Sequence, residues 1–177
     1  MIQDPGTAAI KRPAGGALRL DRLDLKILTT LQVSGRMTNL ELAKMVGISA
    51  TPCAQRVKRM ESAGCIEGYG AKLDIDRLAS NMIVLTEILL RNHQREDFLR
   101  FERGIQDVPH ILNCFLVTGG YDYLVQFIAR DILDYQNAVQ SLVNRDLGVE
   151  KYISYVAIKQ VKRSSIYPLS LLLDTPD

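Results

Sequence analysis

Amide, hydroxyl and basic side chains between residues 51 and 59 are the part of this sequence best suited to specific binding chemistry. Arginine and glutamine can each pair with the edge of a base in the DNA major groove, and lysine suits a phosphate oxygen. The side chains expected to approach bases or nearby phosphates are Thr51, Gln55, Arg56 and Arg59, and Lys58 is expected to contact the DNA backbone.

Two short helices joined by a tight turn, within residues 38–64, are expected to present these side chains. Thr38 and Glu41 form a capping box that starts the first helix, and Gly47 permits the sharp turn. Ser49 or Thr51, followed by proline, starts the second helix. That helix buries Cys53, Val57 and Met60 and turns Gln55, Arg56, Lys58 and Arg59 outward. The candidate DNA contacts are Thr38, Ser49, Thr51, Pro52, Gln55, Arg56, Lys58 and Arg59.

The flanking segments favour a helix-turn-helix over an ordinary helical hairpin with a solvated basic face. Upstream, apolar residues between Leu20 and Leu31 recur at helical spacing, and Asp21 and Asp24 favour a helix start there. Downstream, residues 65–75 mix glycines with apolar residues, which suits a short β-hairpin wing. Three helices and a wing make a winged helix-turn-helix domain, and a plain three-helix bundle with a loop is the alternative.

Charge is distributed unevenly along the 177 residues. Residues 1–75 carry 11 Lys and Arg against 7 Asp and Glu, whereas residues 76–177 carry 11 against 13. The basic half suits phosphate, but so small an excess predicts weak DNA binding by one copy, which two copies on adjacent half-sites would remedy. The length suffices for two small domains. No signal peptide and no apolar run of the ~18–20 residues that span a bilayer are expected, so the predicted location is cytoplasmic.

Cysteine and histidine usage argues against metal binding and catalysis. Cys53, Cys65 and Cys114 are widely spaced without a CxxC pair, and only His93 and His110 could accompany them. We therefore expect reduced thiols and no metal. The sequence also shows no nucleophile elbow and no phosphate-binding glycine loop. This pattern disfavours an enzyme or metabolic subunit that binds an amino acid for catalysis, and no cofactor is expected.

Beyond residue 81 the pattern changes to strands that alternate with helices. One helix ends before Pro109, and another begins at the cap Asp131 and ends by Gly148. The order β-α-β-β-α-β predicts a ferredoxin-like antiparallel sheet with both helices on one face, within an α+β chain. The strands are expected at residues 82–90, 111–117, 123–128 and 152–158.

The other face of this sheet is expected to be covered by a second copy of the chain. The strands are nearly continuous apolar runs rather than clean alternations, so the face without helices also needs cover. A symmetric partner that presents the same face would supply it. The prediction is a homodimer that holds two DNA-binding domains at a fixed separation.

Several blocks in the same order, over roughly residues 18–163, resemble the Lrp/AsnC family of bacterial and archaeal transcription regulators. Residues 20–74 are similar to the DNA-binding domain of that family through its length. VTGGYDYLVQF at 117–127 resembles the turn between the two middle strands of the family's ligand-sensing domain, and SYVAIKQVK at 154–162 resembles its last strand. The resemblance implies a nucleoid-associated DNA-binding protein that dimerises through its C-terminal sheet and assembles further, commonly into octamers.

The resemblance also implies a small effector, usually an amino acid, bound between dimers near the glycine-containing turn. An amino acid needs an acceptor for its ammonium group, such as Asp122, and exposed backbone amides for its carboxylate, as at Gly119 and Gly120. A plain hairpin turn is the alternative, because glycine and aspartate favour turns. By position, the candidate effector residues are Gly119, Gly120, Tyr121, Asp122, Ile132, Leu133 and Tyr155.

The leading hypothesis is a sequence-specific transcription regulator whose activity or assembly responds to a small effector. An architectural DNA-wrapping protein with little ligand response is the alternative. Leucines at 169 and 171–173 would dock on a neighbouring subunit or cover local core. The expected organisation is a disordered tail (1–19), a winged helix-turn-helix domain (20–74), a linker (75–81), a ferredoxin-like effector-binding and dimerisation domain (82–163) and a C-terminal extension (164–177).

Overall fold

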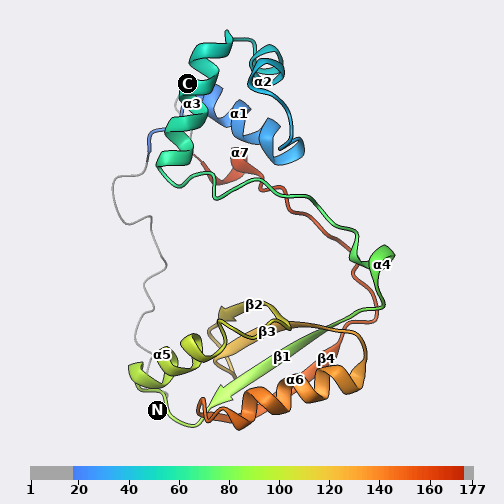
Figure 1. The fold of residues 1–177 in the computed structure, drawn as a ribbon. Helices are drawn as coiled ribbons and strands as arrows, with labels where there is room; N and C mark the ends of the chain where they lie inside the picture. The colour runs from blue at the N-terminus through green and yellow to red at the C-terminus, as the bar shows by residue number, and fades with distance from the viewer. Residues whose placement is uncertain (1–17, 174–177) are drawn as a thin grey trace. The chain divides into compact units, whose positions relative to one another are not determined.

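Two separate units make up residues 18–173, the part of the chain that the computed structural model describes (Figure 1). Residues 18–72 together with 162–173 form one unit, and residues 73–161 form the other. Residues 1–17 of the expected N-terminal tail lie outside the described residues. Within the described range, no helix is long and apolar enough to cross a membrane.

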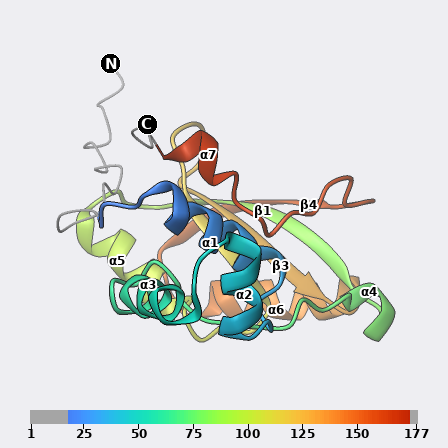
Figure 2. The same ribbon diagram turned by 90° about the horizontal axis from the view of Figure 1, so that it is seen from above.

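The first unit is built on three helices packed around one apolar cluster (Figure 2). Asp21 and Asp24 form a capping box at the start of the first helix, and the predicted box of Thr38 and Glu41 starts the second. The helices are α1 (Arg22–Val33), α2 (Asn39–Val46) and α3 (Ala50–Ser62). Their buried residues are Ile27, Leu42, Ala43, Val46, Cys53, Val57 and Met60. The buried face predicted for α3 is therefore confirmed.

The turn between α2 and α3 depends on a glycine. Gly47 ends α2 in the left-handed region at φ 84°, where a side chain would be strained. Ser49, rather than Thr51, occupies the N-cap position of α3, although its side chain makes no capping hydrogen bond. Thr51 and Pro52 consequently lie in the first turn of α3, and both are exposed.

The segment after α3 does not form the expected β-hairpin, because residues 65–74 contain no strand. Tyr69 instead folds back, and its hydroxyl donates a hydrogen bond of 2.8 Å to Glu61 of α3. Partial burial and the neighbouring Glu61 carboxylate raise the pKa of Tyr69 to about 12. Gly68 and Gly70 flank this tyrosine, and glycines weaken a strand because they have no side chain to pack. An extended segment anchored by one aromatic side chain replaces the hairpin.

The second unit has the predicted β-α-β-β-α-β order. Its four strands form one antiparallel sheet in the order β2-β3-β1-β4. A short helix, α4 (Ile75–Leu78), precedes the sheet within the expected linker. The elements are β1 (Met82–Leu90), α5 (Arg95–Gly104), β2 (Ile111–Leu116), β3 (Tyr123–Ala129), α6 (Ile132–Asn144) and β4 (Val149–Val156). The last strand starts earlier than the expected residue 152, because Val149 already pairs with Leu90 of β1.

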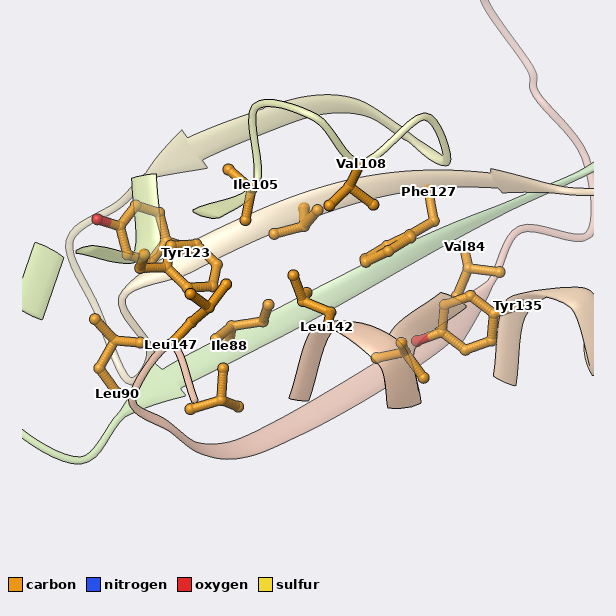
Figure 3. Close-up of a cluster of buried hydrophobic side chains, with 14 of the residues drawn as sticks. Val84, Ile88, Leu90, Ile105, Val108, Tyr123, Phe127, Tyr135, Leu142 and Leu147 are labelled. Carbon is orange, nitrogen blue, oxygen red and sulfur yellow. The ribbon is translucent and has the colours of Figure 1, made fainter. Parts of the chain in front are cut away.

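One face of the sheet and both helices share a single core (Figure 3). Val84, Ile88 and Phe127 of the strands pack with Leu142 of α6 and with Phe101 of α5. A chain of three hydroxyls, from the buried Thr86 and Tyr135 and the exposed Ser154, ties α6 to two strands. The Tyr135 hydroxyl lies 2.9 Å from the Thr86 hydroxyl and 2.5 Å from the Ser154 hydroxyl. The expected placement of both helices on one face is confirmed.

The opposite face of the sheet is open in the single chain. Leu85 of β1, Phe115 of β2, and Ile153 and Tyr155 of β4 are all more than one third exposed. Leu85 pairs with Tyr155 across β1 and β4, so these two side chains share that face. An apolar surface of this kind is typical of a sheet that packs against another sheet.

The C-terminal segment belongs to the first unit. Its short helix α7 (Leu169–Leu172) lies beside α1 in both ribbon views (Figures 1 and 2). Leu169 is half-buried, whereas Leu171 and Leu172 remain exposed. The leucines of the extension therefore give only slight local cover in one chain.

Candidate nucleic-acid interface and effector site

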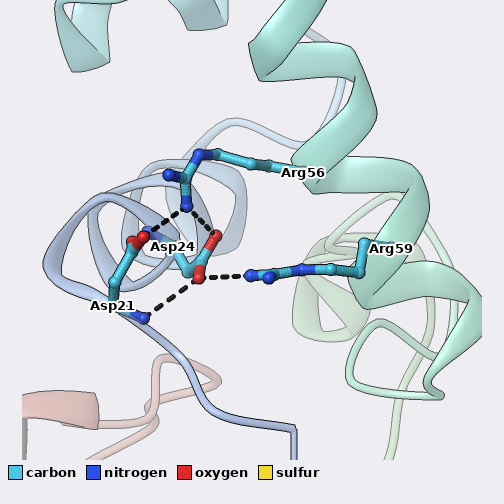
Figure 4. A network of polar contacts seen from close by, with 4 residues as sticks. All are labelled: Asp21, Asp24, Arg56 and Arg59. Carbon is cyan, nitrogen blue, oxygen red and sulfur yellow. Dashed lines mark hydrogen bonds and ion pairs between the residues drawn. The ribbon is translucent and has the colours of Figure 1, made fainter.

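A fully buried carboxylate, Asp24, holds α3 against α1 (Figure 4). Arg56 reaches Asp24 Oδ1 at 2.8 Å and Asp21 Oδ2 at 2.6 Å, and Arg59 reaches Asp24 Oδ2 at 2.5 Å. The Asp21 amide also donates to Asp24 Oδ2 at 3.0 Å. A buried carboxylate is tolerated only when it is paired and hydrogen-bonded, and here two guanidinium groups and one amide satisfy it.

This network changes the expected role of the two arginines. The Arg56 side chain is only 28% exposed and contacts both carboxylates, so it does not face outward as expected. Arg56 turns inward because the carboxylate of Asp24 is negatively charged. The hydrogen bond from the Asp24 amide, followed by the contact with Arg56, lowers the pKa of Asp21, and the two carboxylates raise the pKa of Arg56. The Arg59 side chain is 45% exposed, more than that of Arg56.

The other side of α3 borders a shallow groove of about 430 Å³. Thr51, Gln55 and Lys58 line it at i, i+4 and i+7, and all three are exposed. Asn39, the first residue of α2, lines it from the neighbouring helix. Sequence reasoning missed Asn39, although its position next to the cap Thr38 was a usable signal. Polar side chains that converge on one groove form a surface suited to the edges of bases.

The predicted DNA-contacting residues thus separate into two groups. Thr51, Gln55 and Lys58 share the groove, and Thr38 lines an adjoining hollow with Asn39 and Lys58. Ser49 and Pro52 lie exposed at the start of α3. The arginines instead contact α1 on another side of the same helix.

Hydrogen bonds hold the predicted effector turn in place. The Asp122 carboxylate accepts from the Leu90 amide at 2.7 Å and lies 3.2 Å from His93 Nε2, and it is 13% exposed. The Val117 amide donates to the Asp122 carbonyl at 2.9 Å. Gly119 adopts φ 148°, and neither Gly119 nor Gly120 has a neighbouring atom where a Cβ would stand. The turn therefore offers open backbone, while Asp122 fastens it to the end of β1.

The remaining effector candidates lie in two places. Ile132 and Leu133, exposed at the start of α6, follow β3, whereas the glycine turn precedes β3. The two sets consequently lie about 20 Å apart at opposite ends of a seven-residue strand. One chain does not bring all the predicted effector residues together.

Tyr155 contacts a carboxylate, Glu87, that sequence reasoning missed. Partial loss of solvent, then the charge of Glu87 and a hydrogen bond to it, raise the pKa of Tyr155, with a further contribution from Tyr121. Glu87 lies on the open face of β1, opposite Leu124 and Ile153. The apolar character of the strand concealed this residue, because a single glutamate within MIVLTEILL gives no periodic signal.

The described part of the chain does not bring metal-binding side chains together. Among residues 18–173, no group of three or more His, Cys, Asp or Glu side chains is placed to hold a metal ion. Cys53, Cys65 and Cys114 are free thiols. Burial raises the pKa of the Cys114 thiol to about 11, so this cysteine stays protonated and unreactive near neutral pH.

These two units define a class of protein, a helix-turn-helix DNA-binding regulator joined to a ligand-binding ferredoxin-like domain. Residues 20–67 match the family described as winged helix-turn-helix DNA-binding, and residues 83–167 match the Lrp/AsnC ligand binding domain. A transcriptional regulatory protein of Halomonas elongata, DoeX, is 45% identical over 84% of this chain and 94% of its own. The leucine-responsive regulatory protein of Escherichia coli is 38% identical over 82% of this chain and 89% of its own.

Solved structures give the same result. A transcriptional regulator of Neisseria meningitidis in complex with L-Met superposes with a TM-score of 0.79 at 32% identity, over 87% of this chain and 99% of its own. An AsnC family regulator of Agrobacterium tumefaciens gives 0.81 at 30% identity, over 87% of this chain and all of its own. The chain belongs to the Lrp/AsnC family. It is a DNA-binding transcription regulator with a ligand-binding domain, and no catalytic activity is associated with the names of these relatives.

The buried carboxylate predicts a stability difference between neighbouring residues of α3. Arg56→Ala removes two charged hydrogen bonds and should lower the free energy of unfolding by about 1–3 kcal/mol. Lys58→Ala, the matched control on the exposed side, should change it by less than about 0.5 kcal/mol. Urea unfolding followed by circular dichroism measures both. Equal stability of the two variants would show that the network does not hold α3.

Proposed function

We propose that the chain binds double-stranded DNA as a homodimer and that an amino acid bound between copies modulates this binding. The observation that carries the proposal is the separation of roles on α3. Arg56 and Arg59 anchor the helix to Asp24, which leaves Thr51, Gln55 and Lys58 exposed together in one groove. A rigidly held helix with a free polar face is what the major groove accepts.

Within this proposal each exposed side chain of the helix pair has a role. The Gln55 amide pairs with a base edge, and Thr51 approaches a base or a nearby phosphate. Lys58 contacts the DNA backbone, as do the hydroxyls of Thr38 and Ser49 at two helix N-termini, where phosphates bind well. Pro52 adds apolar contact beside Ser49. Arg59 can reach a phosphate from its exposed side, whereas Arg56 would first have to leave both of its carboxylates.

The open face of the sheet supports assembly into a homodimer. Leu85, Phe115, Ile153 and Tyr155 expose apolar surface on three strands of the sheet, and a second copy presenting the same face would remove that surface from water. A dimer also gives two DNA-binding units, which the small positive charge of one unit requires. Further assembly into octamers extends the same proposal.

An effector between copies is supported by the distribution of the candidate residues. The glycine turn and the start of α6 lie at opposite ends of β3, so a complete pocket needs more than one chain. Open backbone at Gly119 and Gly120 suits a carboxylate. Glu87 with Tyr155, or the exposed part of Asp122, suits an ammonium group, and Ile132 and Leu133 suit an apolar side chain. The neighbouring structure from Neisseria meningitidis holds L-Met. We propose that the protein acts in the cytoplasm, on the DNA of a bacterial or archaeal nucleoid.

The groove predicts two different effects on DNA binding. Gln55→Ala should cost about 1–3 kcal/mol on a duplex selected from a random pool and reduce the preference over a scrambled duplex. Lys58→Ala should weaken both duplexes alike and reduce the salt dependence by about one phosphate contact. Fluorescence anisotropy at several salt concentrations measures these changes, with Gln136→Ala on α6 as control. Unchanged binding in both variants would place the reading face elsewhere, and equal affinity for selected and scrambled DNA would favour an architectural protein.

The open sheet face predicts the oligomeric state. Size-exclusion chromatography with light scattering should give at least a dimer at micromolar concentration. Ile153→Glu puts a charge on this face and should shift the protein toward monomer, because an unpaired charge in an apolar interface is costly. Asn137→Glu, on the exposed side of α6, adds the same charge and should leave the assembly unchanged. A monomeric parent protein would contradict the proposal.

The proposed effector site predicts that some amino acids raise the melting temperature and others do not. Among the twenty amino acids, those that bind the native form should raise the melting temperature, by the equivalent of about 2.7 kcal/mol at a hundredfold excess over Kd. Leu133→Asp should lose most of that shift while the melting temperature without amino acid stays the same, because Leu133 is exposed in one chain. The proposed effector class is wrong if none of the twenty changes the melting temperature of the parent protein.

A further inference from the structure

Gln32, near the end of α1, is contacted by both of the segments within residues 18–173 that join the two units. Its side-chain oxygen accepts from the Tyr167 amide at 2.6 Å, and its side-chain nitrogen donates to the Tyr167 carbonyl at 3.3 Å. Its backbone carbonyl accepts from Lys72 Nζ at 3.1 Å. Lys72 is the last residue before one crossing between the units, and Tyr167 lies shortly after the other crossing.

The contact with Tyr167 is specific in its geometry. A glutamine amide that pairs with both the N–H and the C=O of one residue imitates the hydrogen bonding of a neighbouring strand. The register of residues 164–169 on α1 is therefore fixed by one side chain. Lys72 adds a positive charge at the C-terminal end of α1, where the helix dipole favours a cation.

The same segment is only lightly held otherwise. Tyr167, Leu171 and Leu172 are 70%, 82% and 64% exposed, and α7 is one turn long. Few buried apolar contacts and exposed hydrogen bonds place a segment at the low end of local stability. Residues 164–173 can consequently detach from α1 at a small cost in free energy. A permanent structural element would be held more tightly.

The segment also continues directly from the ligand-binding domain. Tyr155, on the last strand, lies twelve residues before Tyr167 in the chain, and the Ala157 amide makes the last hydrogen bond to β1. The match to the Lrp/AsnC ligand binding domain extends to residue 167. The final residues of that match therefore end on α1 of the DNA-binding unit.

We infer that residues 164–173 form a detachable strap, bound by α1 through Gln32, that restricts the orientations available to the DNA-binding unit. With the strap bound, two of the described chain segments tether this unit, and with the strap released one described segment, residues 65–74, remains as a tether. The inference rests on the proposed DNA binding by a dimer. When one DNA-binding unit of a restrained pair has bound, the effective concentration of the second unit near its half-site is higher. The second unit therefore binds at a smaller cost in free energy.

Two measurements on the full-length protein test the strap. In Gln32→Ala, hydrogen exchange of the amides in residues 164–169 should be faster than in the parent, and Thr29→Ala, an exposed change on the same helix, should leave it unchanged. Gln32→Ala and a chain that ends at Arg163 should both lose about 3- to 10-fold in affinity for a selected duplex with two half-sites. Both should bind a duplex with a single half-site within twofold of the parent.

Three outcomes would contradict the proposed strap. Unchanged exchange in Gln32→Ala, or unchanged affinity for the two-half-site duplex in both variants, overturns it. An equal loss on the single and double half-sites also overturns it, because that result means damage to the DNA-binding unit itself. If the parent protein selects no duplex, the proposed function fails, while the exchange experiment still reports whether Gln32 holds the strap.

Discussion

The DNA-binding unit depends on one buried negative charge. Asp24 is fully buried at the start of α1, and its desolvation is offset only because Arg56 and Arg59 of α3 and the Asp21 amide all contact its oxygens. This requirement fixes the rotation of α3 about its axis. Because both arginines contact α1, the groove side of the helix is left to Thr51, Gln55 and Lys58, so an internal electrostatic constraint determines which polar side chains of α3 are exposed together.

The ligand-binding unit is constrained instead by an imbalance between the two faces of its sheet. Both helices cover the face that carries Val84, Ile88 and Phe127, and the buried hydroxyls of Thr86 and Tyr135 pair there, with Ser154 as a further partner of Tyr135. The other face keeps its apolar surface, with Glu87 as a charge within it. The composition of this face supports the proposed homodimer, and so does the division of the effector candidates between the two ends of β3.

Sequence reasoning performed best where the signal was local or periodic. The capping box of Thr38 and Glu41, the turn at Gly47 and the buried stripe of Cys53, Val57 and Met60 follow from spacing within a few residues, and the structure confirms them. The same holds for the order of strands and helices after residue 81. It failed at residues 65–74, where apolar residues among glycines suggested paired strands, because pairing depends on a partner strand rather than on composition.

The sequence by itself determined the class of both units, the helix that carries the exposed polar face and the turn that resembles an effector site. These depend on hydrophobic periodicity and on short-range hydrogen bonds, which a linear pattern records. Only the tertiary structure decided that Arg56 turns toward Asp24, that Glu87 stands beside Tyr155 and that Gln32 holds Tyr167. Each of these contacts joins residues more than thirty positions apart, and a linear pattern does not record which distant groups must neutralise or pair with one another.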